Sequence, residues 1–179
     1  HEIINYIELR KKEMNPIWSP KQEFVLQSRM EHLRQRISSE NSIILKDYSE
    51  LHKFSIENQE TFWRTIWEDM GLQGVQGEVA LENPQLMPGA KFFPEGRINF
   101  AKNCLIHDQA DDGIAIIAHD ETGLRRELSW GELRASVASF QKMLMEAGVQ
   151  ASDVVGGYVA NGPEAVIAAL ATLSIGAIW

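Results

Sequence analysis

The sequence has 179 residues, of which 44% are hydrophobic and 23% charged, and its formal net charge is -8. This composition is typical of an acidic, soluble globular protein, and it argues against nucleic acid as a partner because phosphate binding favours basic surfaces. The single cysteine, Cys104, excludes an internal disulfide framework and suits a reducing compartment.

The two ends of the sequence carry their own signals. The first 18 residues have charges scattered among the apolar positions and no continuous apolar core, so no signal peptide is predicted. The chain starts at His1 instead of methionine and stops inside an apolar run. We therefore expect both ends to be cut from a longer protein.

The N-terminal part is predicted to be helical. Apolar residues recur at spacings of four, three and four, which predicts a helix that begins at Pro20 with Ser19 as its cap. This stripe consists of Leu26, Met30, Leu33 and Ile37. Docking on the body of the same protein is the favoured use of such a stripe, and binding of a partner subunit is the alternative.

A second helix is predicted between Asn58, which can cap it, and Gly71, which can end it, with Glu60 in the first turn. Its broad aromatic face consists of Phe62, Trp63, Ile66, Trp67 and Met70. A flat ligand could bind such a face, but aromatic residues at helical spacing usually fill cores, so packing is favoured.

The stretch 71–97 is punctuated by glycine and proline and has no helical period. Phe92 and Phe93 within it need burial. We expect an extended connector that wraps a surface, as opposed to a flexible linker.

From about residue 100 onward the sequence alternates between strand and helix signals. Two short strands, 113–120 and 125–130, flank an Asp120–Gly123 turn. Ser129 and Glu132 form a capping box for a helix that Gly148 ends, and its apolar residues are Leu133, Val137, Phe140, Leu144 and Ala147. A strand over 153–160 and a helix starting at Pro163 follow. The order predicts a layered α/β sheet that is incomplete in this chain.

The uncharged run Ala165–Trp179 predicts an all-round apolar helix buried inside a larger protein, because its fifteen residues are too few for a membrane span of about twenty. If the rest of that larger protein is absent, the apolar helix surface is exposed, and this part of the chain should self-associate or be poorly soluble. The residues expected to lose cover are Val166, Ile167, Leu170, Leu173, Ile175 and Trp179.

Motifs that carry chemistry are scarce. Gly157 and Gly162 have the spacing of a phosphate loop, but Pro163 and Glu164 stand where lysine and a hydroxyl residue are needed, so a helix start with close strand packing is favoured. The other candidates are also weak. Cys104 and His107 make only two metal ligands, His32, His52 and His119 have no triad partners, and Asp111–Asp112 is predicted to be a solvated loop pair.

Five blocks of the sequence nevertheless occur in a familiar order. They are "PIWSP", "FWRTIWEDMG", "PGAKFFPEGRINFAKNCL", "ELSWGELRASVASF" and "GPEAVIAALATLSIGAIW". In this order they resemble the front of acetoacetyl-CoA synthetases, which are adenylate-forming acyl-CoA synthetases, from about Pro16 to Trp179. The resemblance implies an N-terminal helical extension over 1–45, an acetyl-CoA-synthetase-type N-terminal region over 46–105, and the truncated start of the AMP-binding domain over 106–179.

Acetyl-CoA synthetases are the nearest alternative branch. "INFAKNCL" and "PEAVIAALA" also resemble that branch, but Ile106–Asp108 and Ile178–Trp179 depart from it. "MPGAKFFP" and "LSIGAIW" are more similar to the acetoacetyl branch. Ala160 and Gly162 depart from the usual Pro-Asn-x-Pro loop of the superfamily.

The resemblance implies an acid–thiol ligase that joins acetoacetate to CoA with ATP and Mg²⁺, in the cytoplasm, within lipid metabolism and ketone body utilisation. The groups that handle phosphate, adenine and CoA in this superfamily lie downstream of residue 179. We therefore assign no catalytic, cofactor-binding or metal-binding residue here, and we expect this chain alone to be inactive and without cofactors. The alternative class is a non-catalytic interaction module formed by Glu2–Met70, and no membrane or nucleic-acid partner is expected.

Overall fold

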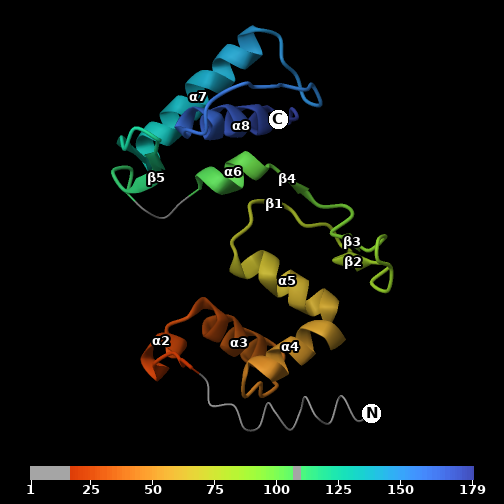
Figure 1. Cartoon of the computed structure of the whole chain (residues 1–179). Coiled ribbons are helices and arrows are strands. Elements are labelled where there is room, and N and C mark those ends of the chain that lie inside the picture. The colour runs from red at the N-terminus through yellow and green to blue at the C-terminus, as the bar shows by residue number, and fades with distance from the viewer. Residues whose placement is uncertain (1–16, 107–109) are drawn as a thin grey trace, which may run out of the picture. The chain divides into compact units, whose positions relative to one another are not determined.

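A computed structural model describes residues 17–106 and 110–179 of the chain (Figure 1). The signal-peptide question concerns residues that lie almost wholly outside this part. Two compact units, His1–Thr65 and Ile66–Trp179, make up the chain, and each is described by itself. The domain boundaries at residues 46 and 106 stay predictions.

Short helices form the first unit. They are α2 (Gln22–Leu26), α3 (Arg29–Glu40), α4 (Tyr48–Glu57) and the start of α5 (Gln59–Asp69). The single helix predicted from Pro20 with a Ser19 cap is wrong, because the chain breaks between α2 and α3. Ser28 caps α3, and its hydroxyl accepts a hydrogen bond from the backbone N–H of Glu31 at 3.2 Å.

The break changes what the apolar stripe does. Leu33 and Ile37 on α3 are 6% and 0% exposed and belong to the core of the first unit. Leu26 and Met30 are each 50% exposed. The C-terminal half of the stripe therefore packs inside the protein, as favoured, and only the other half remains on the surface.

Arg34 joins α3 to the segment before α4. Its guanidinium pairs with Glu31 and also donates to the carbonyl oxygen of Leu45, which is buried. The hydrogen bonds from Arg34 lower the pKa of Glu31 from 4.5 to about 2. Glu31 therefore stays ionised under all but strongly acidic conditions.

The predicted start and stop of α5 are confirmed. The helix begins directly after Asn58 and ends before Gly71, whose φ of 61° requires a glycine-like backbone. The N–H of Gly71 bonds to the carbonyl of Glu68 at 3.0 Å, and that of Leu72 bonds to Trp67 at 3.2 Å. These two bonds are the Schellman pattern that closes helices.

The connector of the second unit folds back on itself as a ribbon. Strand β1 (Gly74–Val75) pairs antiparallel with β4 (Arg97–Ile98), and β2 (Leu81–Glu82) pairs with β3 (Lys91–Phe92). Phe93 is partly buried and lies 4.9 Å from Trp67 between ring centroids, so packing by Trp67 is confirmed. The predicted burial of Phe92 is wrong, since it is 51% exposed. Strand β3 ends at Phe92, and Phe93 adopts a left-handed backbone conformation with φ 46°, so the two side chains leave the chain in different directions.

The hairpin and the helix after it are confirmed. Strands β5 (Ile114–His119) and β6 (Arg125–Ser129) pair antiparallel across a turn in which the Asp120 carboxylate accepts from two backbone N–H groups. Helix α7 (Trp130–Glu146) starts with the predicted capping box of Ser129 and Glu132. At its end, Gly148 adopts a φ of 90°.

The last part of the chain is a minimal β-α-β unit. Helix α8 (Pro163–Ile175) starts at Pro163 as predicted, but Gly176 ends it in a left-handed conformation, so the expected helix does not reach Trp179. Residues 177–178 instead run back beside Asp153–Val155, with a parallel bridge between Val154 and Ile178. The strand predicted over 153–160 is reduced to this bridge, because strand geometry needs a hydrogen-bonded neighbour and, among the described residues, 176–178 supply it.

Helices α7 and α8 lie side by side and share the core of the second unit (Figure 1). Its buried residues are Ala101, Leu133, Val137, Leu144, Leu170 and Ala171. Leu170 was expected to lose cover, but it is only 7% exposed, whereas Val166 and Trp179 are 43% and 40% exposed. In the part of the chain that the structure describes, no helix is long and apolar enough to cross a membrane.

Candidate functional site

The turn before α8 was the one candidate for a phosphate loop. Pro163 occupies the first helical position and offers no N–H, and the Glu164 carboxylate pairs with Arg126 of β6 at 2.5 Å. This hydrogen bond lowers the pKa of Glu164 below its ordinary value. A carboxylate that stays ionised at the helix start repels a phosphate, so the turn has the chemistry of a helix cap.

Gly157 in the same turn has a packing role. A Cβ atom built there would lie 2.4 Å from Cη2 of Trp179 and 3.1 Å from Cζ2, which is closer than real atoms approach. The glycine therefore makes room for the indole, in agreement with the predicted close strand packing.

Two asparagines, one at the N-cap of helix α6 (Phe100–Leu105) and one within it, tie distant segments together, and the sequence analysis missed both roles. The Asn99 side chain accepts from the N–H of Lys102 at 2.9 Å and so caps α6. Its amide nitrogen also donates to the carbonyl of Ser174 at 2.9 Å, in the last turn of α8. One side chain thus satisfies the start of one helix and the end of another.

Asn103, one turn later, holds the connector ribbon. Its side-chain oxygen accepts from the N–H of Gln73 at 2.8 Å, and its amide nitrogen donates to the Gln73 carbonyl at 3.0 Å. This pair of bonds imitates a β-bridge between a side chain and a backbone. The spacing of four between the two asparagines, which puts them on one face of α6, was the available signal.

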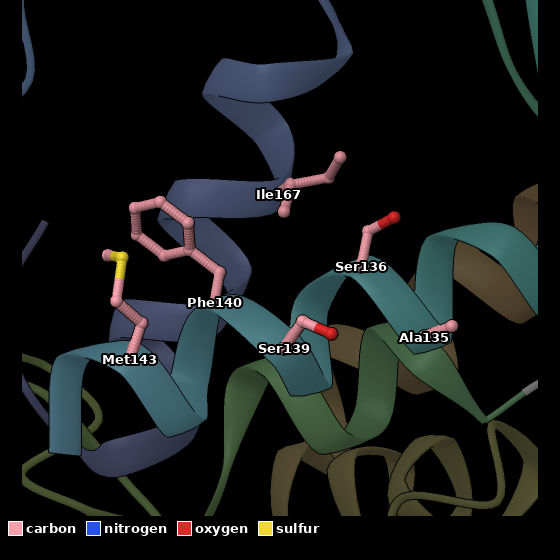
Figure 2. A pocket seen from close by; sticks show the side chains of 6 residues that line it. All are labelled: Ala135, Ser136, Ser139, Phe140, Met143 and Ile167. Carbon is pink, nitrogen blue, oxygen red and sulfur yellow. The ribbon is translucent and has the colours of Figure 1, made fainter. Parts of the chain in front are cut away.

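An open groove of about 490 Å³ runs along α7 next to α8. Figure 2 shows that five of its labelled side chains come from α7 and that Ile167 comes from α8. The α7 residues are Ala135, Ser136, Ser139, Phe140 and Met143. No charged group lines the groove, so its chemistry is that of a packing surface more than of an anion or metal site.

The structure brings none of the other weak candidates together within the residues that it describes. Cys104 is half-buried on α6, and His107 lies outside the described residues, so this pair is not tested. Asp111 is 82% exposed and pairs with Arg134, while His52 stacks on Tyr48 at 6.1 Å. Over residues 17–106 and 110–179, no group of three or more His, Cys, Asp or Glu side chains could hold a metal ion.

Charge is unevenly divided between the units. Residues 66–179 carry 15 Asp and Glu against 7 Lys and Arg, which is a net charge of -8 and equals that of the whole chain. An ATP molecule with its phosphates would approach an acidic surface here. This excess of carboxylates over cationic side chains does not favour the binding of phosphate groups.

Two known sequence families match successive parts of the chain. The family described as acetyl-coenzyme A synthetase N-terminus matches residues 48–104, and the AMP-binding enzyme family matches residues 106–179. The two matches adjoin and together cover most of the described structure.

Individual relatives match over a longer range. An acetoacetyl-coenzyme A synthetase of Rhizobium meliloti (strain 1021) is 36% identical over 164 residues, which is 92% of this chain and 25% of the relative. A malonamoyl-CoA synthetase of Penicillium aethiopicum is 36% identical over 151 residues, which is 81% of this chain and 21% of that protein. This chain thus spans about a quarter of the length of the curated relatives it matches.

The fold also matches a solved structure. The acetoacetyl-CoA synthetase from Streptomyces lividans superimposes with a TM-score of 0.81 and 31% sequence identity, over 93% of this chain and 26% of that one. The predicted α/β class, with a helical front followed by the first strands and helices of a larger domain, is confirmed by this match.

Proposed function

The chain resembles the N-terminal part of acetoacetyl-CoA synthetases over most of its length, and from this we propose that it is the front of an ATP-dependent acid–thiol ligase. In the proposed reaction, ATP adenylates a carboxylate with release of pyrophosphate, and the CoA thiolate then displaces AMP to give the thioester. The superposition on the Streptomyces lividans enzyme over 93% of this chain is the observation that carries the proposal.

Activation by ATP has a plain physical reason. A carboxylate is a poor electrophile, and the mixed anhydride with AMP supplies a leaving group whose negative charge a cation can stabilise. We propose that this chain contributes scaffold to this chemistry, and the ionised Glu164 at the start of α8 supports this for the one turn with phosphate-loop spacing. We therefore derive no catalytic step from this chain.

The names of two relatives support a substrate class. Acetoacetate and malonamate, the acids that correspond to the two products named, are both short carboxylates with a carbonyl group at the β position. They differ only in the group on the β-carbonyl carbon, which is a methyl group in acetoacetate and an amino group in malonamate. We propose that the complete enzyme selects this β-carbonyl acid and that acetoacetate is its substrate, with ATP, Mg²⁺ and CoA as co-reactants.

The complete enzyme is expected to use acetoacetate with a higher kcat/KM than acetate in a pyrophosphate-release assay. A site built to hydrogen-bond the β-carbonyl rejects the acid that lacks it, because its buried polar groups are then left unpaired. Malonamate is the matched comparison, since it keeps the β-carbonyl. Equal or better use of acetate would move the assignment to the acetyl-CoA synthetase branch.

The 179-residue chain alone is expected to show no saturable ATP binding and no acyl-adenylate formation. The second unit has a net charge of -8, and Arg126 beside the turn before α8 is already paired with Glu164. Calorimetric titration with ATP and Mg²⁺ tests this. A clear one-site isotherm would contradict our assignment of the chain to scaffold only.

A second function class rests on the helical front. Leu26 and Met30 are half exposed on α2 and α3, and with Tyr48 they line a cavity of about 370 Å³ in the first unit. This surface supports an interaction module in which a partner subunit covers the exposed half of the stripe. Pyrophosphate release by the complete protein with any short acid would favour the ligase.

Location in the cytoplasm and a role in lipid metabolism and ketone body utilisation follow from the ligase proposal.

A further inference from the structure

Helix α6 is held to the rest of the second unit by little apolar contact. It lies against α8 (Figure 1), but α7 and α8 supply five of the six buried residues of the core named above. The sixth is Ala101 of α6, whose side chain is the smallest of the hydrophobic ones. Cys104 and Leu105 pack against this core and are only partly buried. Burial of apolar surface therefore stabilises the docking of α6 weakly.

Two polar side chains add to this docking. Asn99 donates to the carbonyl of Ser174 in α8 at 2.9 Å, and the guanidinium of Arg134 in α7 donates to the carbonyl of Leu105 at 3.3 Å. Arg134 also pairs with the carboxylate of Asp111. The side chain of Arg134 thus holds the end of α6 and the segment that leads into β5.

An open groove of about 290 Å³ runs between α6 and α7, beside these polar contacts. Asn99 and Leu105 line it on the side of α6, and Arg134 and Gln141 line it on the side of α7. Water that enters the groove can replace a hydrogen bond that breaks. Contacts of this kind open at a lower cost than the buried apolar contacts between α7 and α8.

The ribbon formed by β1 to β4 depends on α6 in turn. Each of its strands has two residues, and hairpins this short are not stable by themselves. Asn103 fastens the ribbon to α6 through its two hydrogen bonds with Gln73. If α6 leaves the core, the ribbon loses its support at this end. The ribbon and α6 should therefore open together.

We propose that residues 73–105, which we call the arm, open as one cooperative unit while α7 and α8 stay folded, and that Arg134 is the clamp that limits this opening. Segments with few buried apolar contacts are the ones that open locally. The arm ends next to residue 104, where the match to the acetyl-coenzyme A synthetase N-terminus ends, and α7 and α8 lie in the AMP-binding match. The boundary between the two family matches is then also a boundary between cooperative units.

Native-state hydrogen exchange, followed by mass spectrometry at urea concentrations below the unfolding transition, tests the proposal in the wild-type chain. Amides of the ribbon and of α6 should share one opening free energy and one urea dependence, because they become exposed in the same event. Both values should be smaller than those of α7 and α8, since opening the arm exposes less surface than unfolding the whole unit. Equal values in the arm and in α7 and α8 would overturn the proposal.

Leu144→Ala separates the opening of the arm from the unfolding of the core. Leu144 is 7% exposed and lies near the C-terminal end of α7, away from Arg134. The change should speed exchange in α7 and α8 about thirtyfold or more, and exchange in the arm should not change. Circular dichroism checks that the variant folds, and Leu144→Val is the milder variant for the same comparison. Equal acceleration in the arm and the core would mean that the arm opens only when the core unfolds, against the proposal.

Arg134→Met tests the clamp. The variant keeps a long side chain but loses the donors to Leu105 and Asp111, so exchange in α6 should rise about tenfold. Exchange in the ribbon should rise by the same factor. Lys142→Met is the matched control, because Lys142 also lies on α7 but pairs with Glu146 of the same helix. Its exchange should match the wild type.

Two results with Arg134→Met would contradict the proposal. Faster exchange in α6 with an unchanged ribbon would show that the two parts of the arm open separately. Unchanged exchange in α6 would show that Arg134 does not limit the opening.

Discussion

Substituting Leu170→Glu is expected to unfold the second unit. Leu170 is 7% exposed in the core that α7 and α8 share, where it packs with Leu133, Val137 and Ala171. The change removes a buried aliphatic side chain and leaves an unpaired carboxylate in its place, at a cost of roughly 5 kcal/mol or more. A domain of this size has a total stability of about 5–15 kcal/mol.

Hydrogen exchange followed by mass spectrometry measures the loss of protection within α7 and α8, and it reports on the second unit separately from the first. Val166→Glu is the matched control, because Val166 lies one turn earlier on α8 and is 43% exposed. In the Val166→Glu variant, the protection of α7 and α8 against hydrogen exchange should stay close to that of the wild type. If Leu170→Glu kept wild-type protection in α7 and α8, the described core would be wrong.

The second large effect is expected for Asn99→Ala. The change removes the cap of α6, worth about 0.5–2 kcal/mol. It also removes the donor to the carbonyl of Ser174 at the end of α8, worth about 1–3 kcal/mol. The second unit should therefore lose roughly 2–4 kcal/mol of stability. Urea denaturation, with exchange in α6 and α8 as the local readout, measures it.

Asn99→Asp separates the two roles of this side chain. Aspartate still caps α6, but its carboxylate replaces the amide donor and faces the carbonyl of Ser174, at the negative end of the α8 dipole. We expect Asn99→Asp to be at least as destabilising as Asn99→Ala. Stability near the wild-type value would show that only the cap matters and that the link to α8 contributes nothing.

Local signals predicted helix ends and turns well. The capping box of Ser129 and Glu132, the turn at Asp120 and the stops at Gly71 and Gly148 all depend on contacts three to five residues apart. The break between α2 and α3 was missed although it too has a local signal. Ser28 and Glu31 have capping-box spacing, and the apolar stripe that continues across them outweighed it in the prediction.

The resemblance to acetoacetyl-CoA synthetases was also predictable from the sequence, because five short blocks in order are a pattern that no single block provides. The asparagines of "INFAKNCL" belonged to that pattern, yet their roles did not follow from it. Asn99 reaches Ser174, 75 residues away, and Asn103 reaches Gln73, 30 residues away. Such partners are chosen by how helices pack.

By itself, then, the sequence determined the elements whose backbone conformation is set by near neighbours: the hairpin β5–β6, the capped helix α7, and the proline start of α8. Only the tertiary structure decided that Leu170 is covered while Val166 is not, that Gly157 makes room for Trp179, and that residues 153–155 pair with 177–178. The physical reason is the range of the forces involved. Caps and turns satisfy backbone groups within one helical turn, whereas burial and strand pairing depend on segments far apart in the chain, and their positions are settled by packing.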